Sequence, residues 1–250
     1  MKLIYLYHSG FALLAEHFTV IIDYFQDSQS LTEGIVHDSL LNRPGKLYVL
    51  SSHFHADHFN RRVMNWKERK ADIVYILSKD ICRKRGIAKP AACWLKKGET
   101  YQDENLRVKA YGSTDAGISF ELQLCGKTIF HAGDLNNWHW MDESDEAEWR
   151  GYENHFLKEL ENICSSMPAA DLALFPVDPR LGSEYMRGAI QFTEKIQTRA
   201  FLPMHFDEAY EAAHRFQSLA RDKGILSPDI QYRGQVFDNL ICLELPIKLK

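Results

Sequence analysis

The sequence contains few cysteines, and their spacing argues against several kinds of protein. Five cysteines occur among 250 residues, an odd number, and no two have the C-x-x-C spacing. A disulfide-stapled domain or a zinc site made only of thiolates is therefore not expected. We interpret the cysteines as small buried residues in a reducing compartment, and we predict a cytoplasmic protein.

Long hydrophobic runs and a strong net charge are also missing. No stretch approaches the roughly 20 apolar residues that span a bilayer. The apolar start of the chain is interrupted by His8-Ser9-Gly10, which argues against a signal peptide. The formal net charge is −4, so no global positive field attracts nucleic acid or anionic lipid. We therefore predict neither a membrane partner nor a nucleic-acid partner.

Repeats, low-complexity segments and long linkers are absent, so residues 1–250 are predicted to form a single domain. Strands are expected at residues 3–7, 11–15, 19–23, 47–51, 73–77, 106–111, 118–124, 128–131, 172–177, 200–204 and 240–245. Helices are expected at residues 60–66 with Asn60 as N-cap, from the acidic run 142–148 to about 164, at 184–196 and at 208–221. Strands dominate the first half and alternate with helices in the second. This order predicts two sheets with helices packed outside them.

The sequence does contain a dense run of metal-ligand residues, His53-Phe54-His55-Ala56-Asp57-His58, directly after the predicted strand 47–51. Two histidines one residue apart on an extended chain point the same way and can bind one ion. Asp57 and His58 are adjacent, and a turn there would direct both to a second ion. Imidazole and carboxylate ligands suit zinc, and also manganese or iron.

Four further polar groups follow the ends of other predicted strands. They are Ser113-Thr114-Asp115, His131-Ala132-Gly133-Asp134, Asp178-Pro179-Arg180 and His205. Loops that leave one edge of a rigid sheet can converge on one site. We therefore expect these groups to lie near the histidine run.

These motifs resemble those of the metallo-β-lactamase-fold hydrolases. The histidine run resembles the hallmark motif of that superfamily, and His8-Ser9-Gly10-Phe11 with Ile22-Asp23 is similar to its first hairpin and buried aspartate. Gly133-Asp134 and Pro203-Met204-His205 are similar to its later ligand motifs. The resemblance covers nearly the whole chain and implies an α+β fold, a four-layer αββα sandwich. Within the superfamily the chain resembles the branch that contains the ascorbate-phosphate lactonases.

The resemblance also implies a ligand set. His53 and His55 would hold one metal, Asp57, His58 and His205 the other, and Asp134 would bridge the two. Family members usually carry one more ligand histidine before the bridging aspartate, but residues 110–117 contain no histidine. Asp115 either substitutes for it, which would favour manganese, iron or magnesium over zinc, or caps a turn before Gly117.

Other polar residues are assigned supporting or substrate-binding roles. Asp23 follows a buried run and is expected to orient a ligand histidine or a backbone amide. His8 and His131 are expected to be packed or supporting residues rather than ligands. Arg180 is a candidate clamp for a phosphate or carboxylate of the substrate, with Asp178 beside it, unless the two form a structural pair. His139, between Trp138 and Trp140, is a candidate substrate contact, unless these aromatic residues pin the following helix.

We therefore predict a metal-dependent hydrolase with one or two divalent ions, zinc first and manganese or iron as alternatives. The ions would activate hydroxide for attack on a small-molecule lactone, ester, amide or phosphoester. Asp57 is the predicted catalytic residue, which orients the hydroxide and moves a proton. The alternatives are a protein that binds metal or ligand without turnover, and a nuclease of the same fold.

Overall fold

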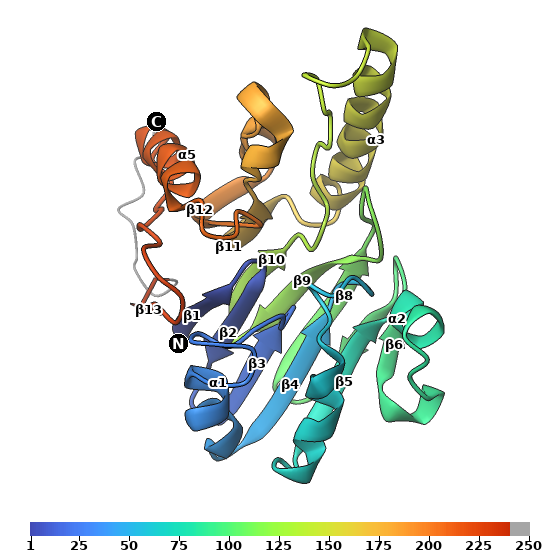
Figure 1. Cartoon of the computed structure of the whole chain (residues 1–250), viewed down its shortest axis with the longest axis vertical. Coiled ribbons are helices and arrows are strands. Elements are labelled where there is room, and N and C mark those ends of the chain that lie inside the picture. Colours follow the sequence, from blue (N-terminus) through green and yellow to red (C-terminus); the bar gives the residue numbers. More distant parts are fainter. Residues whose placement is uncertain (241–250) are drawn as a thin grey trace.

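The computed structural model describes residues 1–240 as two β-sheets packed against each other, with helices on the outer faces (Figure 1). The first sheet has the strand order β13-β1-β2-β3-β4-β5-β6. Its strands are β1 (Lys2–Tyr7), β2 (Gly10–Leu14), β3 (Phe18–Ile22), β4 (Lys46–Ser51), β5 (Ile73–Ser78), β6 (Cys93–Leu95) and β13 (Val236–Asp238). The second sheet has the order β12-β11-β10-β9-β8-β7. Its strands are β7 (Thr100–Gln102), β8 (Leu106–Tyr111), β9 (Ser119–Leu124), β10 (Lys127–His131), β11 (Ala169–Pro176) and β12 (Gln197–Met204).

Helical segments cover the outer face of each sheet and complete four layers. The first half of the chain supplies α1 (Ile35–Asp38), η1 (Leu40–Asn42), η2 (Arg61–Glu68), α2 (Lys79–Lys84) and η3 (Lys89–Ala91). The second half supplies α3 (Glu146–Cys164), η4 (Pro179–Glu184), α4 (Arg187–Lys195) and α5 (Tyr210–Asp222). The predicted α+β sandwich is confirmed. None of the helices in residues 1–240 combines the length and apolar character that crossing a bilayer requires.

The alternation of side chains along β1 explains why this sheet is covered on both faces. Leu3 and Tyr5 belong to the core that includes the second sheet. Ile4 and Leu6 point the other way, into a core shared with Val36 and other residues of the outer helical layer. Successive side chains of a strand face opposite sides, so a strand that is apolar at every position needs a packing layer on each side.

The directions of the strands place the connections that carry the candidate site residues at one edge of each sheet. Strands β3, β4 and β5 are parallel, and so are β10, β11 and β12. Since β1 and β3 each run antiparallel to β2, they run parallel to each other, and the same holds for β8 and β10 around β9. The connections after β1, β3 and β4 therefore leave one edge of the first sheet. Those after β8, β10, β11 and β12 leave one edge of the second.

The predicted strands between residues 3 and 204 are present, with ends within about three residues of the predicted ones. The stretch at residues 60–66 is a 3₁₀ rather than an α-helix, but its predicted cap is present because Asn60 accepts a hydrogen bond from the backbone N–H of Arg62 at 3.0 Å. The structure adds several short elements that were not predicted, including α1, α2, β6, β7 and β13. The strand predicted at residues 240–245 lies outside the described residues, apart from Leu240.

Candidate metal centre

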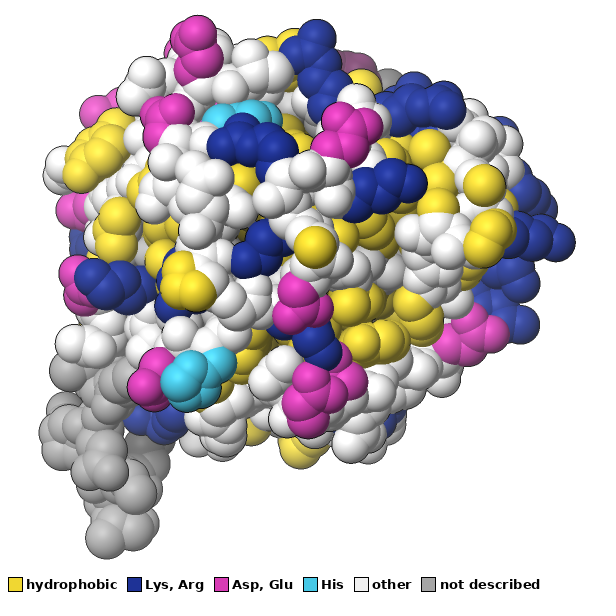
Figure 2. Space-filling model, turned by 90° about the horizontal axis from the view of Figure 1, so that it is seen from below, with side chains coloured by type: hydrophobic (Ala, Val, Ile, Leu, Met, Phe, Trp, Pro, Cys, Tyr) yellow, Lys and Arg dark blue, Asp and Glu magenta, His cyan; other side chains and the backbone are white. Residues whose placement is uncertain are grey.

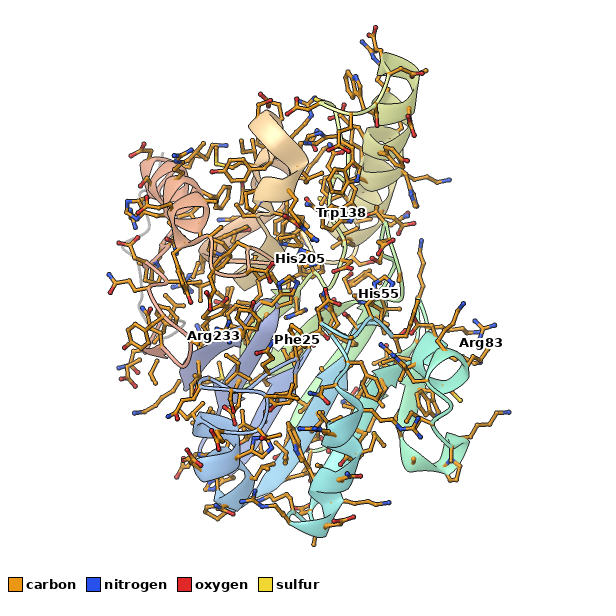
Figure 3. The ribbon with its side chains drawn as sticks, in the orientation of Figure 1. Phe25, His55, Arg83, Trp138, His205 and Arg233 are labelled. Carbon is orange, nitrogen blue, oxygen red and sulfur yellow. The ribbon has the colours of Figure 1, made fainter. Side chains whose placement is uncertain are left out.

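Seven side chains with metal-ligand atoms converge where the loops leave the two sheets. One group, the His8 cluster, consists of His8, Asp57, His58 and His205. The other, the His53 cluster, consists of His53, His55 and Asp134. Within each cluster one ligand atom of every residue lies within 4.8 Å of the others. In Figure 3 the labelled His55 and His205 lie near the centre of the molecule, together with Trp138.

The carboxylate of Asp134 lies between the two clusters. Its Oδ1 is 3.0 Å from Nε2 of His58 and 3.3 Å from Nε2 of His205. Its Oδ2 is 3.1 Å from Nε2 of His53 and 3.9 Å from Nδ1 of His55. Each oxygen faces a different cluster, which is the arrangement that a bridging carboxylate requires.

Each histidine of the His8 cluster is held from behind by a carboxylate. The distances from Nδ1 to a carboxylate oxygen are 2.7 Å for His58 and Asp23, 2.9 Å for His205 and Asp178, and 2.8 Å for His8 and Asp207. A carboxylate can only accept, so Nδ1 donates and the lone pair of a neutral ring is left on Nε2. Metal-binding histidines are commonly oriented in this way.

The ligand atoms that these contacts leave unpaired test whether a cation fits the site. Nε2 of His8, His58 and His205 and Oδ1 of Asp134 are buried, and within residues 1–240 they have no hydrogen-bond partner of acceptable geometry. Buried polar atoms are seldom left unpaired, because losing water without a replacement contact is costly. Three imidazoles and a carboxylate that converge in this way suit a divalent cation such as zinc.

The crowding of charges perturbs the pKa values of the site. Burial would raise the pKa of Asp134, but His58, His205 and His53 hold it well below its usual range. Burial would lower the pKa of His205, but the charge of Asp134 and the hydrogen bond to Asp178 raise it to about 9. The carboxylates therefore stabilise positive charge at the position where the ligand atoms meet.

The backbone at the site adopts a conformation that is rare for residues other than glycine. The φ angles are 55° at His8, 47° at Asp23, 66° at His205 and 50° at Asp207. Residues in this left-handed region are strained, and they persist where the surrounding contacts determine them. Four such residues in one place indicate that the fold fixes these side chains at some cost in local stability.

Asp23 makes both kinds of contact that its position predicted. It is fully buried, it accepts the backbone N–H and the hydroxyl of Ser52, both at 2.7 Å, and it holds His58. Because the Ser52 hydroxyl donates to Asp23, it accepts from Nδ1 of His53 at 2.9 Å. Asp23 thus positions His58 directly and His53 through Ser52.

Asp115 lies beside the His53 cluster but outside the group defined above. Its Oδ2 is 3.7 Å from Nδ1 of His55, and its side chain is 51% exposed. Its own backbone N–H donates weakly to the Ser113 hydroxyl at 3.4 Å. Asp115 is therefore at the rim, next to the His53 cluster, which contains two histidines and Asp134.

The three candidate substrate contacts are placed differently from one another. Asp178 is buried, holds His205, and receives two hydrogen bonds from Nε of Arg180 and one from its Nη2. These contacts outweigh burial and lower the pKa of Asp178 to about 2. Arg180 remains 58% exposed at the rim. His139 is buried with Nδ1 accepting from the N–H of Met141 and Nε2 donating to the carbonyl of Glu184, so neither nitrogen is available to a substrate.

Two residues of the site were not recognised as such from the sequence. His8 was expected to be packed or supporting, but its Nε2 faces the cluster and lies 3.5 Å from Oδ2 of Asp57. Asp207, which holds His8, was not considered. The predicted opening meander offered a signal for His8. The first and third strands of a meander are parallel, so the residues that follow them leave the same edge of the sheet. His131 is packed as expected, because its Nε2 donates to the carbonyl of Ser9 and its Nδ1 accepts from the N–H of Gly133.

Comparison with known proteins tests the fold. No protein-family model matches the chain. A curated UPF0173 metal-dependent hydrolase from Desulforamulus reducens is 25% identical over 226 residues, which cover 83% of this chain and 85% of the relative. The structure of Igni18, a metallo hydrolase from Ignicoccus hospitalis, aligns with a TM-score of 0.67 and 17% identity over 94% of this chain and 97% of Igni18. The metallo-β-lactamase fold protein YhfI from Bacillus subtilis aligns with a TM-score of 0.62 and 9% identity over 95% and 99%. The chain has the metallo-β-lactamase fold.

The metallo-β-lactamase fold does not fix the metal. CmlA, a diiron β-hydroxylase from Streptomyces venezuelae, aligns with a TM-score of 0.65 and 11% identity over 94% of this chain and 53% of CmlA. The same fold therefore occurs with iron in a protein whose name denotes hydroxylation. For this chain the metal has to be argued from its own ligand atoms.

Proposed function

We propose that this protein is a metal-dependent hydrolase that binds one or two divalent cations at the two clusters, zinc first and manganese or iron as alternatives. The observation that supports this most directly is the convergence of buried, unpaired ligand atoms on Asp134. The ligands would be His53 and His55 at one position, Asp57, His58 and His205 at the other, and Asp134 between them. Asp115 is a further candidate beside His55.

A bound cation of this kind lowers the pKa of a coordinated water and polarises the carbonyl or phosphoryl oxygen under attack. The residues of the chain would supply orientation and proton transfer. Asp57 is 39% exposed, whereas His53 and His58 are fully buried. A carboxylate at the open side of the site can accept a proton at Oδ2 from the attacking water and pass it to the leaving group.

The proposed substrate is a small molecule with a lactone, ester, amide or phosphoester bond. Arg180 is the charged group best placed to bind an anionic part of it. Its Nε and Nη2 are occupied by Asp178, while no hydrogen bond within residues 1–240 uses its Nη1. A guanidinium braced by a carboxylate is already oriented, so less freedom is lost when it binds an anion.

Nucleic acid is a less suitable substrate. The net charge is −4, and on the face shown in Figure 2 basic side chains are interspersed with acidic and hydrophobic ones. Polyanion binding is driven by clustered positive charge.

The cytoplasm is the proposed location, since Cys82, Cys93, Cys125 and Cys164 are free.

The test is metal content combined with hydrolysis. Purified protein should contain one or two divalent ions per chain and hydrolyse lactone, ester or phosphodiester dyes. Removal of the ions by a chelator should abolish turnover, and their return should restore it. Bound ions without turnover of any dye class would favour the binding protein instead, and salt-sensitive affinity for RNA or DNA would favour the nuclease.

A further inference from the structure

We propose that His8 is a metal ligand and that the His8 cluster, not the His53 cluster, binds the first and tightest cation. The inference rests on the proposed function in one respect, that the site binds a divalent cation. It adds His8 to the ligand set proposed above, and it states which of the two clusters binds a cation first. The cation is of the zinc type, because the cluster offers three imidazoles and one carboxylate.

The contacts of His8 favour a ligand over a packing role. The residue is 3% exposed, and its Nδ1 is satisfied by Asp207 at 2.8 Å. Its Nε2 is buried and without a hydrogen-bond partner in residues 1–240. A packing histidine such as His131 has both nitrogens engaged by the backbone. His8 instead has one nitrogen fixed and the other directed at the cluster.

His8 is also positioned in the same way as the two neighbouring ligand candidates. His58, His205 and His8 each have a carboxylate on Nδ1 and an unpaired Nε2 on the opposite side of the ring. The rings of His8 and His205 are 4.1 Å apart between centroids, and the backbone N–H of His205 donates to the carbonyl of His8 at 3.2 Å. The connection after β1 and the connection after β12 are thus hydrogen-bonded to each other through the backbone.

The His53 cluster is less complete. His53 is held by a serine hydroxyl rather than a carboxylate. His55 is 41% exposed, and within residues 1–240 its ring is hydrogen-bonded to Nε2 of His53 at 3.0 Å, on the side of the cluster, and not to a carboxylate behind it. The third position has only Asp115, which is 51% exposed. Fewer and more mobile ligands give weaker binding, because more freedom is lost on coordination.

The experiment is a titration of metal-free, full-length protein with Co²⁺ alone, followed by its visible absorbance and by calorimetry. The wild-type protein should bind one equivalent tightly and a second more weakly. His8→Ala should weaken the first equivalent by roughly 100-fold and change its spectrum, and Asp207→Asn should weaken it by roughly tenfold. His55→Ala should weaken only the second equivalent. His17→Ala, at a side chain that is 81% exposed, is the control and should change neither.

Wild-type affinity and spectrum for the first equivalent in His8→Ala would overturn the inference, and so would loss of the first equivalent in His55→Ala. If His8→Ala does not fold by circular dichroism, Asp207→Asn decides, and unchanged first-equivalent affinity there counts against the inference. A wild-type protein that binds no Co²⁺, Zn²⁺ or Mn²⁺ would overturn this inference and the proposed function together. Binding as described without hydrolysis would support the inference and contradict only the proposed function.

Discussion

Asp57 is the accessible carboxylate of the two clusters, since it is 39% exposed whereas Asp134 is 7% exposed. Its carboxylate contacts His8 and His58 and is otherwise partly exposed to solvent. Burial would raise its pKa, but the contact with His8 and the charge of His58 lower it. The group is thus ionised at neutral pH and able to accept a proton.

We expect Asp57→Asn to reduce kcat for a generic ester dye by about 100-fold or more, because an amide can neither accept the proton nor bind the cation as a carboxylate does. The free energy of unfolding should change by less than about 1 kcal/mol, since the side chain is partly exposed. The exposed Asp38→Asn serves as a control for the charge change. Activity close to wild type in Asp57→Asn would remove Asp57 from the mechanism.

Arg180 has a guanidinium nitrogen, Nη1, that no hydrogen bond within residues 1–240 uses, and we expect this nitrogen to select anionic substrates. Arg180→Gln should raise KM for an anionic phosphodiester dye by about tenfold, the loss expected for one charge-assisted hydrogen bond. KM for a neutral ester dye should rise much less. Steady-state kinetics on the two dyes measure this ratio, with Arg180→Lys as the variant that keeps the charge. An equal rise for both dyes would indicate that Arg180 acts only by bracing Asp178.

At the residue scale, the sequence predicted which side chains come together at the site better than it predicted the residues that hold them. The histidine run is informative because its spacing alone brings several candidate ligands to one strand end. His8 carries no such pattern, and its role depends on Asp207, which lies 199 residues further along the chain. The orientation of His139 was equally hidden, because alternating aromatic residues do not reveal which side chain faces the interior.

At the scale of elements, glycines hold the ends of strands close together beneath the ligands. Gly117 has φ 66°, and a Cβ placed there would be 2.1 Å from the carbonyl oxygen of Ser52 and 2.5 Å from Cβ of His53. The N–H of Ile118 donates to that same carbonyl at 3.0 Å. The connection before β9 therefore supports the start of the histidine run, and only glycine fits there.

Gly117→Ala should lower the free energy of unfolding by more than about 1 kcal/mol, because both the backbone conformation and the space are unsuitable for alanine. It should also weaken the more weakly bound cation, since His53 would be displaced. Gly151→Ala, in the middle of α3 with no atom within 4 Å of the new Cβ, is the matched control and should raise stability by about 0.5–1 kcal/mol. Chemical unfolding and Co²⁺ titration measure the two effects. Equal stability of the two variants would contradict the packing argument.

The long elements were predictable because their hydrophobic pattern extends over several residues, as in β4 and β8. The segments α1 and η1 comprise four and three residues, which is too short for a helical period to be visible. The edge strands β6 and β7 are three residues each and are defined by their pairing partners. Such elements depend on tertiary contacts that no local pattern encodes.

At the scale of the whole molecule, Asp103 links the two sheets. It lies between β7 and β8, and its Oδ2 accepts the hydroxyl of Tyr48 from β4 at 2.6 Å. Its Oδ1 accepts the backbone N–H groups of Asn105 and Leu106. Burial would raise the pKa of Asp103, but these hydrogen bonds lower it. The ionised carboxylate is therefore stabilised in the folded protein relative to the unfolded chain.

A lowered folded-state pKa contributes stability that is present above the unfolded value of about 3.9 and is lost as pH falls through the folded value. Asp103→Asn should thus reduce the free energy of unfolding by about 2 kcal/mol at pH 7, and the difference from wild type should shrink below about pH 4. Urea unfolding at several pH values measures this difference. Asp238→Asn, at a side chain that is 61% exposed, should show almost none. A difference that is constant with pH would exclude Asp103 as the titrating group.

The distribution of ligands along the chain has a consequence for biosynthesis. The His8 cluster draws on the connections after β1, β4 and β12, so its donors span positions 8 to 205. A nascent chain therefore lacks a complete His8 cluster until the connection after β12 has left the ribosome. A cation that needs the complete His8 cluster would therefore bind only after both sheets have assembled. If the proposed cation binds there, its loading is a late step, and newly made protein first passes through a metal-free folded state.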